Sequence, residues 1–148
     1  DYFRETAFVD LHDIAGNTND GLHLAALAGT LLAAVAGFGG LRDHGATLAF
    51  APRLPVRLTR LTFRLLYRGR RLRVTIEPEH VCYELLAGEP IEVLHDGEPL
   101  TLAYDAPQTR ALPAVLEPLP IAQPPGRAAR RAGVGADSAN GARATASL

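Results

Sequence analysis

The residues best suited to chemistry lie in one polar turn, GNTNDGLH, at residues 16–23. The turn joins amide, hydroxyl and carboxylate side chains to a histidine, His23, and an almost wholly apolar segment follows. The first N–H groups of a helix lack partners within the helix and carry partial positive charge, so they can bind anions. A helix that begins here predicts an anion site beside His23. The alternative is a core histidine that hydrogen-bonds a neighbouring carbonyl, and spacing alone leaves both open.

The other polar residues of this turn also allow two interpretations. Asn17 and Thr18 could orient a ligand or could simply close the turn. Asn19 or Asp20 could cap the helix that follows, because either side-chain oxygen can accept from the N–H groups of a first turn. A carboxylate beside a bound anion would repel it, so we expect Asp20 to act as a cap.

The segment Leu22–Ala36 is predicted to be the helix that carries this turn. Nearly every residue is apolar, and many are Ala or Gly. A helix that is apolar on all sides is typically buried on all sides. Gly37, Gly39 and Gly40 follow and predict the end of the helix.

Three stretches of the chain resemble one enzyme family. DLHDIAGNTNDGLHLAALAG at residues 10–29, VAGFGGLRDH at residues 35–44 and LAFAPRLP at residues 48–55 are similar to the C-terminal part of glycoside hydrolase family 65. That family contains inverting maltose, trehalose, kojibiose and nigerose phosphorylases, and also acid trehalases. The resemblance extends over residues 1–102, with Leu31 near a position where the family usually has tryptophan.

The resemblance implies an α+β fold in three parts. Residues 1–45 would be the last helices of an (α/α)6 catalytic barrel, and residues 46–106 a small antiparallel β-domain. Residues 107–148 are rich in Pro, Ala, Gly and Arg. We expect disorder from about Glu117, because such a composition buries too little apolar surface to offset the entropy of ordering.

Strand patterns support the β part of this expectation. A short strand is predicted at Thr47–Phe50, and residues 58–76 alternate as in a hairpin that turns at Arg68–Gly69. Further strands are predicted at residues 81–86 and 91–94. Asp96–Gly97 is a strong hairpin signal that leads into residues 100–104.

The family also implies a reaction and a set of binding residues. An inverting phosphorylase would cleave an α-glucoside of the maltose, trehalose or kojibiose type with inorganic phosphate and release β-glucose 1-phosphate. Phosphate replaces the water of an inverting hydrolase, so the protein needs a cradle for an anion rather than a general base. The candidate phosphate-binding residues are His23, Gly21, Asn17 and Thr18. The general acid glutamate of the family would lie before Asp1, which predicts that this chain is inactive alone.

Two alternatives remain open at this level. One is an α-glucosidase or acid trehalase of the same family, in which a carboxylate base takes the place of the phosphate cradle. The other is that this chain by itself is a non-catalytic β-module with two helices attached; a sugar-binding module would show exposed aromatic side chains on a sheet face, with Tyr67, Tyr83 and Tyr104 as the candidates.

Composition limits the partners that we expect. The chain has 148 residues, a net charge of −1 and no methionine, which suggests the C-terminal part of a longer enzyme. This charge gives no reason to expect nucleic acid or membrane as a partner, and no apolar run reaches the ~18 residues of a bilayer span. One cysteine, Cys82, fits a reducing cytoplasm. We expect no metal and no cofactor beyond phosphate as co-substrate, and a homodimer is open.

Overall fold

Helices lead into a β-sheet unit in this protein. The computed structural model describes residues 2–10, 12–13, 16, 19, 21–43 and 45–114. Helix α1 spans Tyr2–Ala7, and helix α2 spans Leu24–Leu32 and continues directly into a π-helical segment, η2, at Ala33–Phe38. Within the described part of the chain, no helix is both long and apolar enough to cross a membrane.

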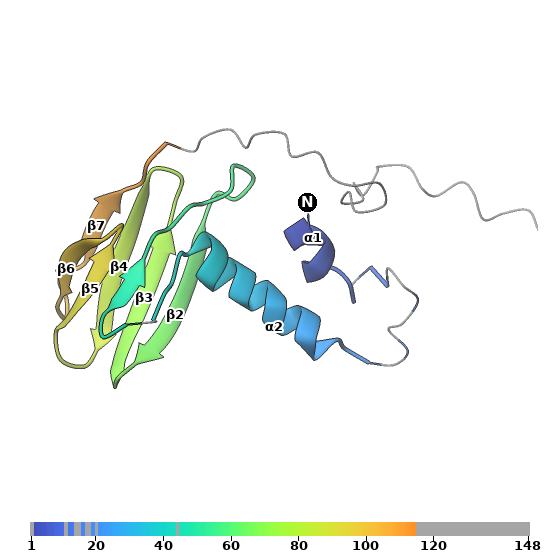
Figure 1. Ribbon diagram of the computed structural model, residues 1–148, viewed down its shortest axis with the longest axis horizontal. Coiled ribbons are helices and arrows are strands. Elements are labelled where there is room, and N and C mark those ends of the chain that lie inside the picture. The colour runs from blue at the N-terminus through green and yellow to red at the C-terminus, as the bar shows by residue number, and fades with distance from the viewer. Residues whose placement is uncertain are drawn as a thin grey trace, which may run out of the picture.

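Two sheets form the β unit (Figure 1). The three-stranded sheet has the order β1-β5-β6, and the four-stranded sheet has the order β2-β3-β4-β7. The strands are β1 (Leu48–Phe50), β2 (Leu61–Tyr67), β3 (Arg70–Ile76), β4 (His80–Ala87), β5 (Ile91–His95), β6 (Glu98–Leu102) and β7 (Gln108–Ala111). All neighbouring pairs are antiparallel except β1 and β5, which run parallel. The predicted antiparallel domain is therefore present with one parallel pair.

The two hairpins turn where the sequence predicts. Arg68 and Gly69 have φ values of 47° and 77°, and Asp96 and Gly97 have φ values of 48° and 90°. Positive φ at both central residues is the geometry of the two-residue turn that matches the right-handed twist of paired strands. These turns fix the register, so that Leu65 lies opposite Leu72 and Val93 lies opposite Leu100.

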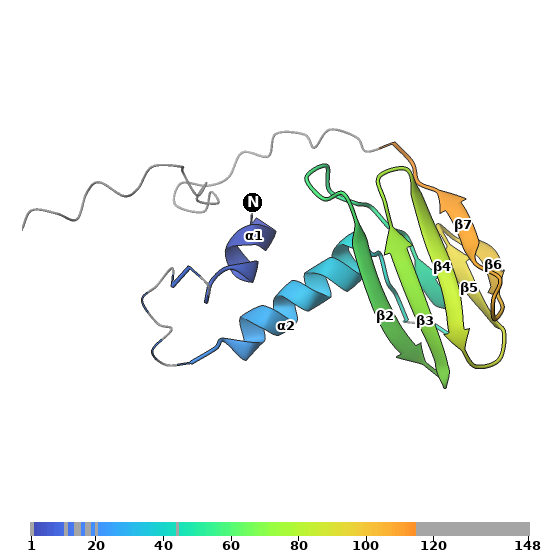
Figure 2. The same cartoon turned by 180° about the vertical axis from the view of Figure 1, so that it is seen from behind.

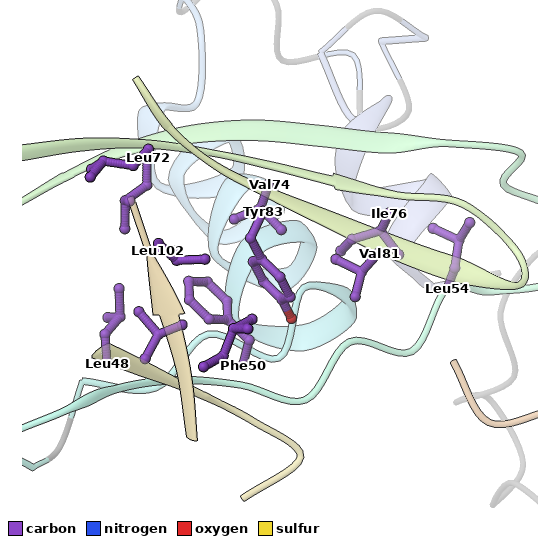
Figure 3. Close-up of a cluster of buried hydrophobic side chains, with 12 residues drawn as sticks. Leu48, Phe50, Leu54, Leu72, Val74, Ile76, Val81, Tyr83 and Leu102 are labelled. Carbon is purple, nitrogen blue, oxygen red and sulfur yellow. The ribbon is translucent and has the colours of Figure 1, made fainter. Parts of the chain in front are cut away.

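The core lies between the facing sheets (Figure 3). Leu72, Val74 and Ile76 of β3 alternate with more exposed residues, as strand geometry requires for one buried face. Leu48 and Phe50 approach from the other sheet. The Phe50 and Tyr83 rings lie 5.2 Å apart between their centroids. Aromatic pairs at this separation contribute beyond their buried area.

Strand β7 corrects the predicted start of the tail. Residues 107–148 were predicted to lie outside the β-domain, yet β7 pairs with β4 from His80 opposite Ala111 to Tyr83 opposite Gln108. The Leu112 N–H donates to the carbonyl of Glu79 at 2.8 Å, and its side chain packs on the core. The composition of residues 107–148 does not indicate a strand at β7, because this strand is stabilised by pairing with β4, which is distant in the sequence. The expectation of disorder from Glu117 falls outside the described residues.

Helix α2 is less buried than its composition predicts. Within α2, all of which is described, no residue is buried, and Leu24, Leu31 and Leu32 are 74%, 63% and 64% exposed. Figures 1 and 2 show α2 leaning away from the sheets, with only its C-terminal end beside them. The described elements of this chain do not cover the helix, so burial on all sides is an expectation for the complete protein, and the chain taken alone exposes the helix as expected.

The end of the helix is fixed tightly to the β unit. Gly40 has a φ of 63°, and a Cβ added there would lie 2.2 Å from the carbonyl oxygen of Ala51. The Arg42 guanidinium donates to the Ala36 carbonyl at 2.5 Å, one of the last acceptors of η2. The predicted helix stop is confirmed at Gly39 and Gly40, whereas Gly37 lies inside η2.

Candidate functional site

The start of α2 is held by a carboxylate from the segment after α1. The main-chain N–H of His23 donates to Oδ2 of Asp10 at 2.8 Å, and Nδ1 of the same histidine lies 2.5 Å from Oδ1. One carboxylate therefore contacts both the main chain and the ring of His23. The Asp10 side chain is only 6% exposed, and that of His23 is 39% exposed.

These contacts keep Asp10 ionised. Hydrogen bonds from the His23 side chain and then from its main chain lower the pKa of Asp10. A carboxylate that accepts such bonds is favoured in its charged form. Its negative charge also lies at the positive end of the helix dipole, a position where anions are stabilised.

Asp10 takes the capping role that the sequence suggested for the turn residues. The structure begins α2 at Leu24 with His23 as its N-cap, so the predicted cap at Asn19 is wrong. The carbonyl of His23 accepts from the N–H groups of Ala26 and Leu27 at 2.9 and 3.1 Å. Asp20, the other predicted cap, lies outside the described residues.

The remaining predicted phosphate-binding residues are placed only in part. Gly21 is exposed, has a φ of 101°, and would place an added Cβ at least 4 Å from every described atom outside its chain neighbours. Asn17 and Thr18 lie outside the described residues. The structure thus places His23 at the first turn with Gly21 two residues before it, and Asp10 is the functional candidate that sequence reasoning missed.

A second polar group crosses the core between the two sheets. The hydroxyl of Tyr83 lies 2.8 Å from Nδ1 of His95, and both side chains are buried. The other ring nitrogen of His95 lies 3.6 Å from Asp96, whose carboxylate accepts two hydrogen bonds from Arg53. Burial lowers the pKa of His95, so its neutral form is favoured. The hydrogen bond between Tyr83 and His95 connects β4 to β5, inside the β unit.

Other chemistry finds little support in the described part of the chain. No group of three or more His, Cys, Asp or Glu side chains there is arranged to hold a metal ion. Cys82 is a free thiol in β4. Tyr104 is 70% exposed beside a cavity of about 200 Å³, but the cavity's Glu84 carboxylate is already bound by Arg73.

Residues 41–102 match the family model for the C-terminal domain of glycosyl hydrolase family 65. The chain carries the C-terminal domain of this family. The match begins directly after the helix stop and ends with β6, so it covers most of the β unit. It confirms the resemblance that the motifs at residues 10–55 suggested.

Relatives extend this similarity into the helical part. The chain is 47% identical over 131 residues to an uncharacterized glycosyl hydrolase of Mycobacterium leprae, across 86% of this chain and 16% of the relative. It is 44% identical to an α,α-trehalose phosphorylase of Thermoanaerobacter brockii and 38% identical to a maltose phosphorylase of Bacillus subtilis. Both alignments cover 68% of this chain and 13% of the relative. The chain thus spans about a sixth or less of these relatives.

A solved structure shows the same fold. The chain matches one described as a kojibiose phosphorylase from the human microbiome with a TM-score of 0.68 and 22% identity. The match covers 74% of this chain and 15% of that one. At this identity the match supports the arrangement of helices and sheets, and it is consistent with a small C-terminal β-domain.

Proposed function

We propose that the complete protein is an inverting disaccharide phosphorylase that uses the start of α2 to bind inorganic phosphate. Its substrate would be an α-glucoside of the maltose, trehalose or kojibiose type, and its product β-glucose 1-phosphate. The observation that carries the proposal is the position of His23, which stands at the first turn of α2 with its ring oriented by Asp10. Relatives named as trehalose and maltose phosphorylases support the reaction class.

The chemistry asks for positioning rather than for a base. Phosphate is already an anion, so it can attack the anomeric carbon once it is held opposite the leaving oxygen. The His23 ring can hydrogen-bond a phosphate oxygen and hold it in place. The main-chain N–H groups of His23, Leu24 and Ala26 already donate to Asp10, the Leu22 carbonyl and the His23 carbonyl, so the ring is the group that carries the proposed contact. The general acid, a glutamate in the family, would come from a part of the complete protein outside this chain.

The charge of Asp10 limits what this site can do alone. The pKa of Asp10 is lowered by the contacts with His23, so the carboxylate is ionised and already occupies the positive end of the helix dipole. Directed hydrogen bonds therefore contribute more here than net positive charge. We expect other parts of the complete protein to supply the cations that balance phosphate.

A hydrolase is the second candidate, and Asp10 is the observation that favours it. An α-glucosidase or acid trehalase would need a carboxylate base near this point, and Asp10 is a carboxylate at this point. However, both of its oxygens contact His23, and these contacts lower its pKa. A general base works best with a pKa near the working pH, so Asp10 is poorly suited to activate water.

Product analysis separates the two reactions. The complete protein would be incubated with maltose, trehalose and kojibiose, each with and without inorganic phosphate, and followed by ³¹P and ¹H NMR. Phosphorolysis predicts turnover that requires phosphate and a new β-glucose 1-phosphate signal. Turnover to glucose at the same rate without phosphate would support the hydrolase instead. This chain alone should show neither reaction, because the general acid is outside it.

A further inference from the structure

We infer that Asp10 is a positioning residue that orients the ring of His23 for its contact with phosphate. The inference rests on the proposed function, since it concerns how the same site is organised. Asp10 itself does not touch phosphate, because a carboxylate and an anion repel each other.

Asp10 contacts His23 at both its main chain and its ring. Its two oxygens accept from the main-chain N–H of His23 at 2.8 Å and contact Nδ1 of the ring at 2.5 Å. The first contact fixes the main chain at the helix start, and the second fixes the rotation of the ring. A ligand contact made by this ring is therefore directed before the ligand arrives, which reduces the entropy that binding must offset.

The contact with Asp10 also determines which ring nitrogen of His23 can contact phosphate. An ionised carboxylate can only accept, so Nδ1 must carry the proton that lies between them. Any contact of the ring with phosphate is then made through Nε2. Nε2 can contact phosphate by accepting from a protonated phosphate oxygen or, when the ring carries both protons, by donating to one. In metal sites, a carboxylate that accepts from the other ring nitrogen orients the histidine ligand in the same way.

The surrounding chain holds Asp10 in place. The segment that carries it turns back directly after α1, where the His12 N–H donates to the Phe8 carbonyl at 2.9 Å. The Phe3 ring of α1 packs edge-on against Phe38 of η2, with centroids 5.0 Å apart. Helix α1 is thereby anchored near the far end of the α2–η2 helix, while Asp10 reaches its start.

A capping role alone would explain the main-chain contact but not the ring contact, and one substitution separates them. Asparagine caps a helix about as well as aspartate, because its side-chain oxygen can accept from the same N–H group. Asn cannot offer a charged oxygen to the ring as well. Asp10→Asn therefore keeps the cap and removes the negative charge beside the ring of His23.

The test is steady-state phosphorolysis by the complete protein, with phosphate and disaccharide varied separately. For Asp10→Asn we expect the KM for phosphate to rise about three- to ten-fold, as for the loss of a charge-assisted contact. The KM for disaccharide should change less than two-fold, and Asp10→Glu should recover part of the loss. Glu77→Gln is the matched control, since it removes the carboxylate from another histidine pair, Glu77 with His80, in the β unit. It should leave both KM values unchanged.

A double variant shows whether Asp10 acts through His23. In a His23→Ala background, Asp10→Asn should raise the KM for phosphate no further. An additional three-fold rise, or equal rises in both KM values with a matching loss of thermal stability, would overturn the positioning role. If Asp10→Asn lowers stability, Asp10→Glu carries the comparison, because it keeps the negative charge: recovery of the phosphate KM supports the positioning role, and no recovery at wild-type stability overturns it.

The outcomes also distinguish this inference from the function beneath it. Unchanged phosphate kinetics in His23→Ala would contradict the proposed phosphate site itself. A large effect of His23→Ala with none of Asp10→Asn would leave the phosphate site standing and overturn the role of Asp10.

Discussion

Tyr83 and His95 place a polar contact inside an otherwise apolar core. Their hydrogen bond joins β4 of one sheet to β5 of the other across 2.8 Å. A buried polar group that loses its partner costs free energy because water cannot replace the bond. The pair therefore specifies how the two sheets face each other, in addition to the area that they bury.

Removing the hydroxyl should weaken the β unit measurably. Tyr83→Phe leaves Nδ1 of His95 without that partner, so we expect the free energy of unfolding to fall by about 1–3 kcal/mol. Urea denaturation of this chain, followed by circular dichroism, measures the change. Tyr104→Phe is the control, since Tyr104 is 70% exposed and its variant should match the wild type. Equal stability of both variants would show that the buried contact contributes nothing.

The same histidine predicts how stability depends on pH. Burial lowers the pKa of His95 from its ordinary value of 6.5. The folded state therefore binds this proton at a lower pH than the unfolded state does. The contribution is present above pH 6.5 and is lost as the pH falls from there toward the folded-state pKa. The melting temperature should drop on acidification from about pH 7 to 5. In His95→Gln this drop should shrink, and an identical slope in both proteins would contradict the assignment.

At the scale of elements, the helix stop at Gly40 determines how α2 meets the β unit. Leu41 donates its N–H to the Val35 carbonyl at 3.2 Å, which closes the helix with Gly40 in the left-handed region. The main chain of Ala51 lies directly against Gly40. A side chain here is excluded both by φ and by space.

Gly40→Ala should therefore destabilise the junction. The left-handed conformation alone costs a non-glycine residue about 1–2 kcal/mol, and the clash with Ala51 adds to this cost. Gly37→Ala is the matched control, since an added Cβ there meets no described atom within 4 Å. Thermal melts of the two variants should show a clear loss for Gly40→Ala and little change or a small gain for Gly37→Ala. A neutral Gly40→Ala would contradict the close approach.

Helix α2 exposes the apolar side chains of Leu24, Leu31 and Leu32. Large exposed apolar patches mark surfaces that bind other elements or aggregate. We expect this chain alone to self-associate, and a Leu24→Glu, Leu31→Glu, Leu32→Glu variant to remain monomeric in sedimentation velocity. Leu66→Glu changes an equally exposed leucine of β2 and should not prevent association. A monodisperse, cooperatively melting wild-type monomer would contradict this prediction.

These elements also show what sequence can predict. The turns at Arg68–Gly69 and Asp96–Gly97 are local, so adjacent residues determine them and they were predicted correctly. Strand β7 was missed because its stability comes from pairing with β4, some thirty residues earlier. The burial of α2 cannot be predicted from composition alone, because burial depends on what covers a helix, whereas composition shows only what the helix could tolerate.

In the candidate site, too, one residue was visible in the sequence and another was not. His23 was proposed because a histidine near the start of an apolar helix is visible in the sequence, although the helix was predicted from Leu22 and α2 begins at Leu24. Asp10 was missed because its contact closes a loop of 13 residues, and an aspartate at the end of a helix has many other uses. The segment that closes this loop includes Asn17 and Thr18, whose proposed contacts remain predictions.

At the scale of the whole molecule, the proposed phosphate site needs more than the described chain. The chain spans about a sixth or less of its phosphorylase relatives, and its Asp10 carboxylate is held ionised at the start of α2. The (α/α)6 barrel, the general acid and the cations that balance phosphate remain predictions for the complete protein. The β unit supports this arrangement by fixing the C-terminal end of α2 through Gly40 and Arg42.

The measurement that tests the central claim most directly is the phosphate dependence of His23→Ala in the complete protein. Loss of a hydrogen bond to an anion costs about 1.5–3 kcal/mol, so kcat/KM for phosphate should fall roughly ten- to a hundred-fold or more. The KM for disaccharide and the melting temperature should change little, since alanine fits at a helix start whose cap comes from Asp10. Unchanged phosphate kinetics, or a loss of all activity in proportion to a loss of stability, would return His23 to a structural role.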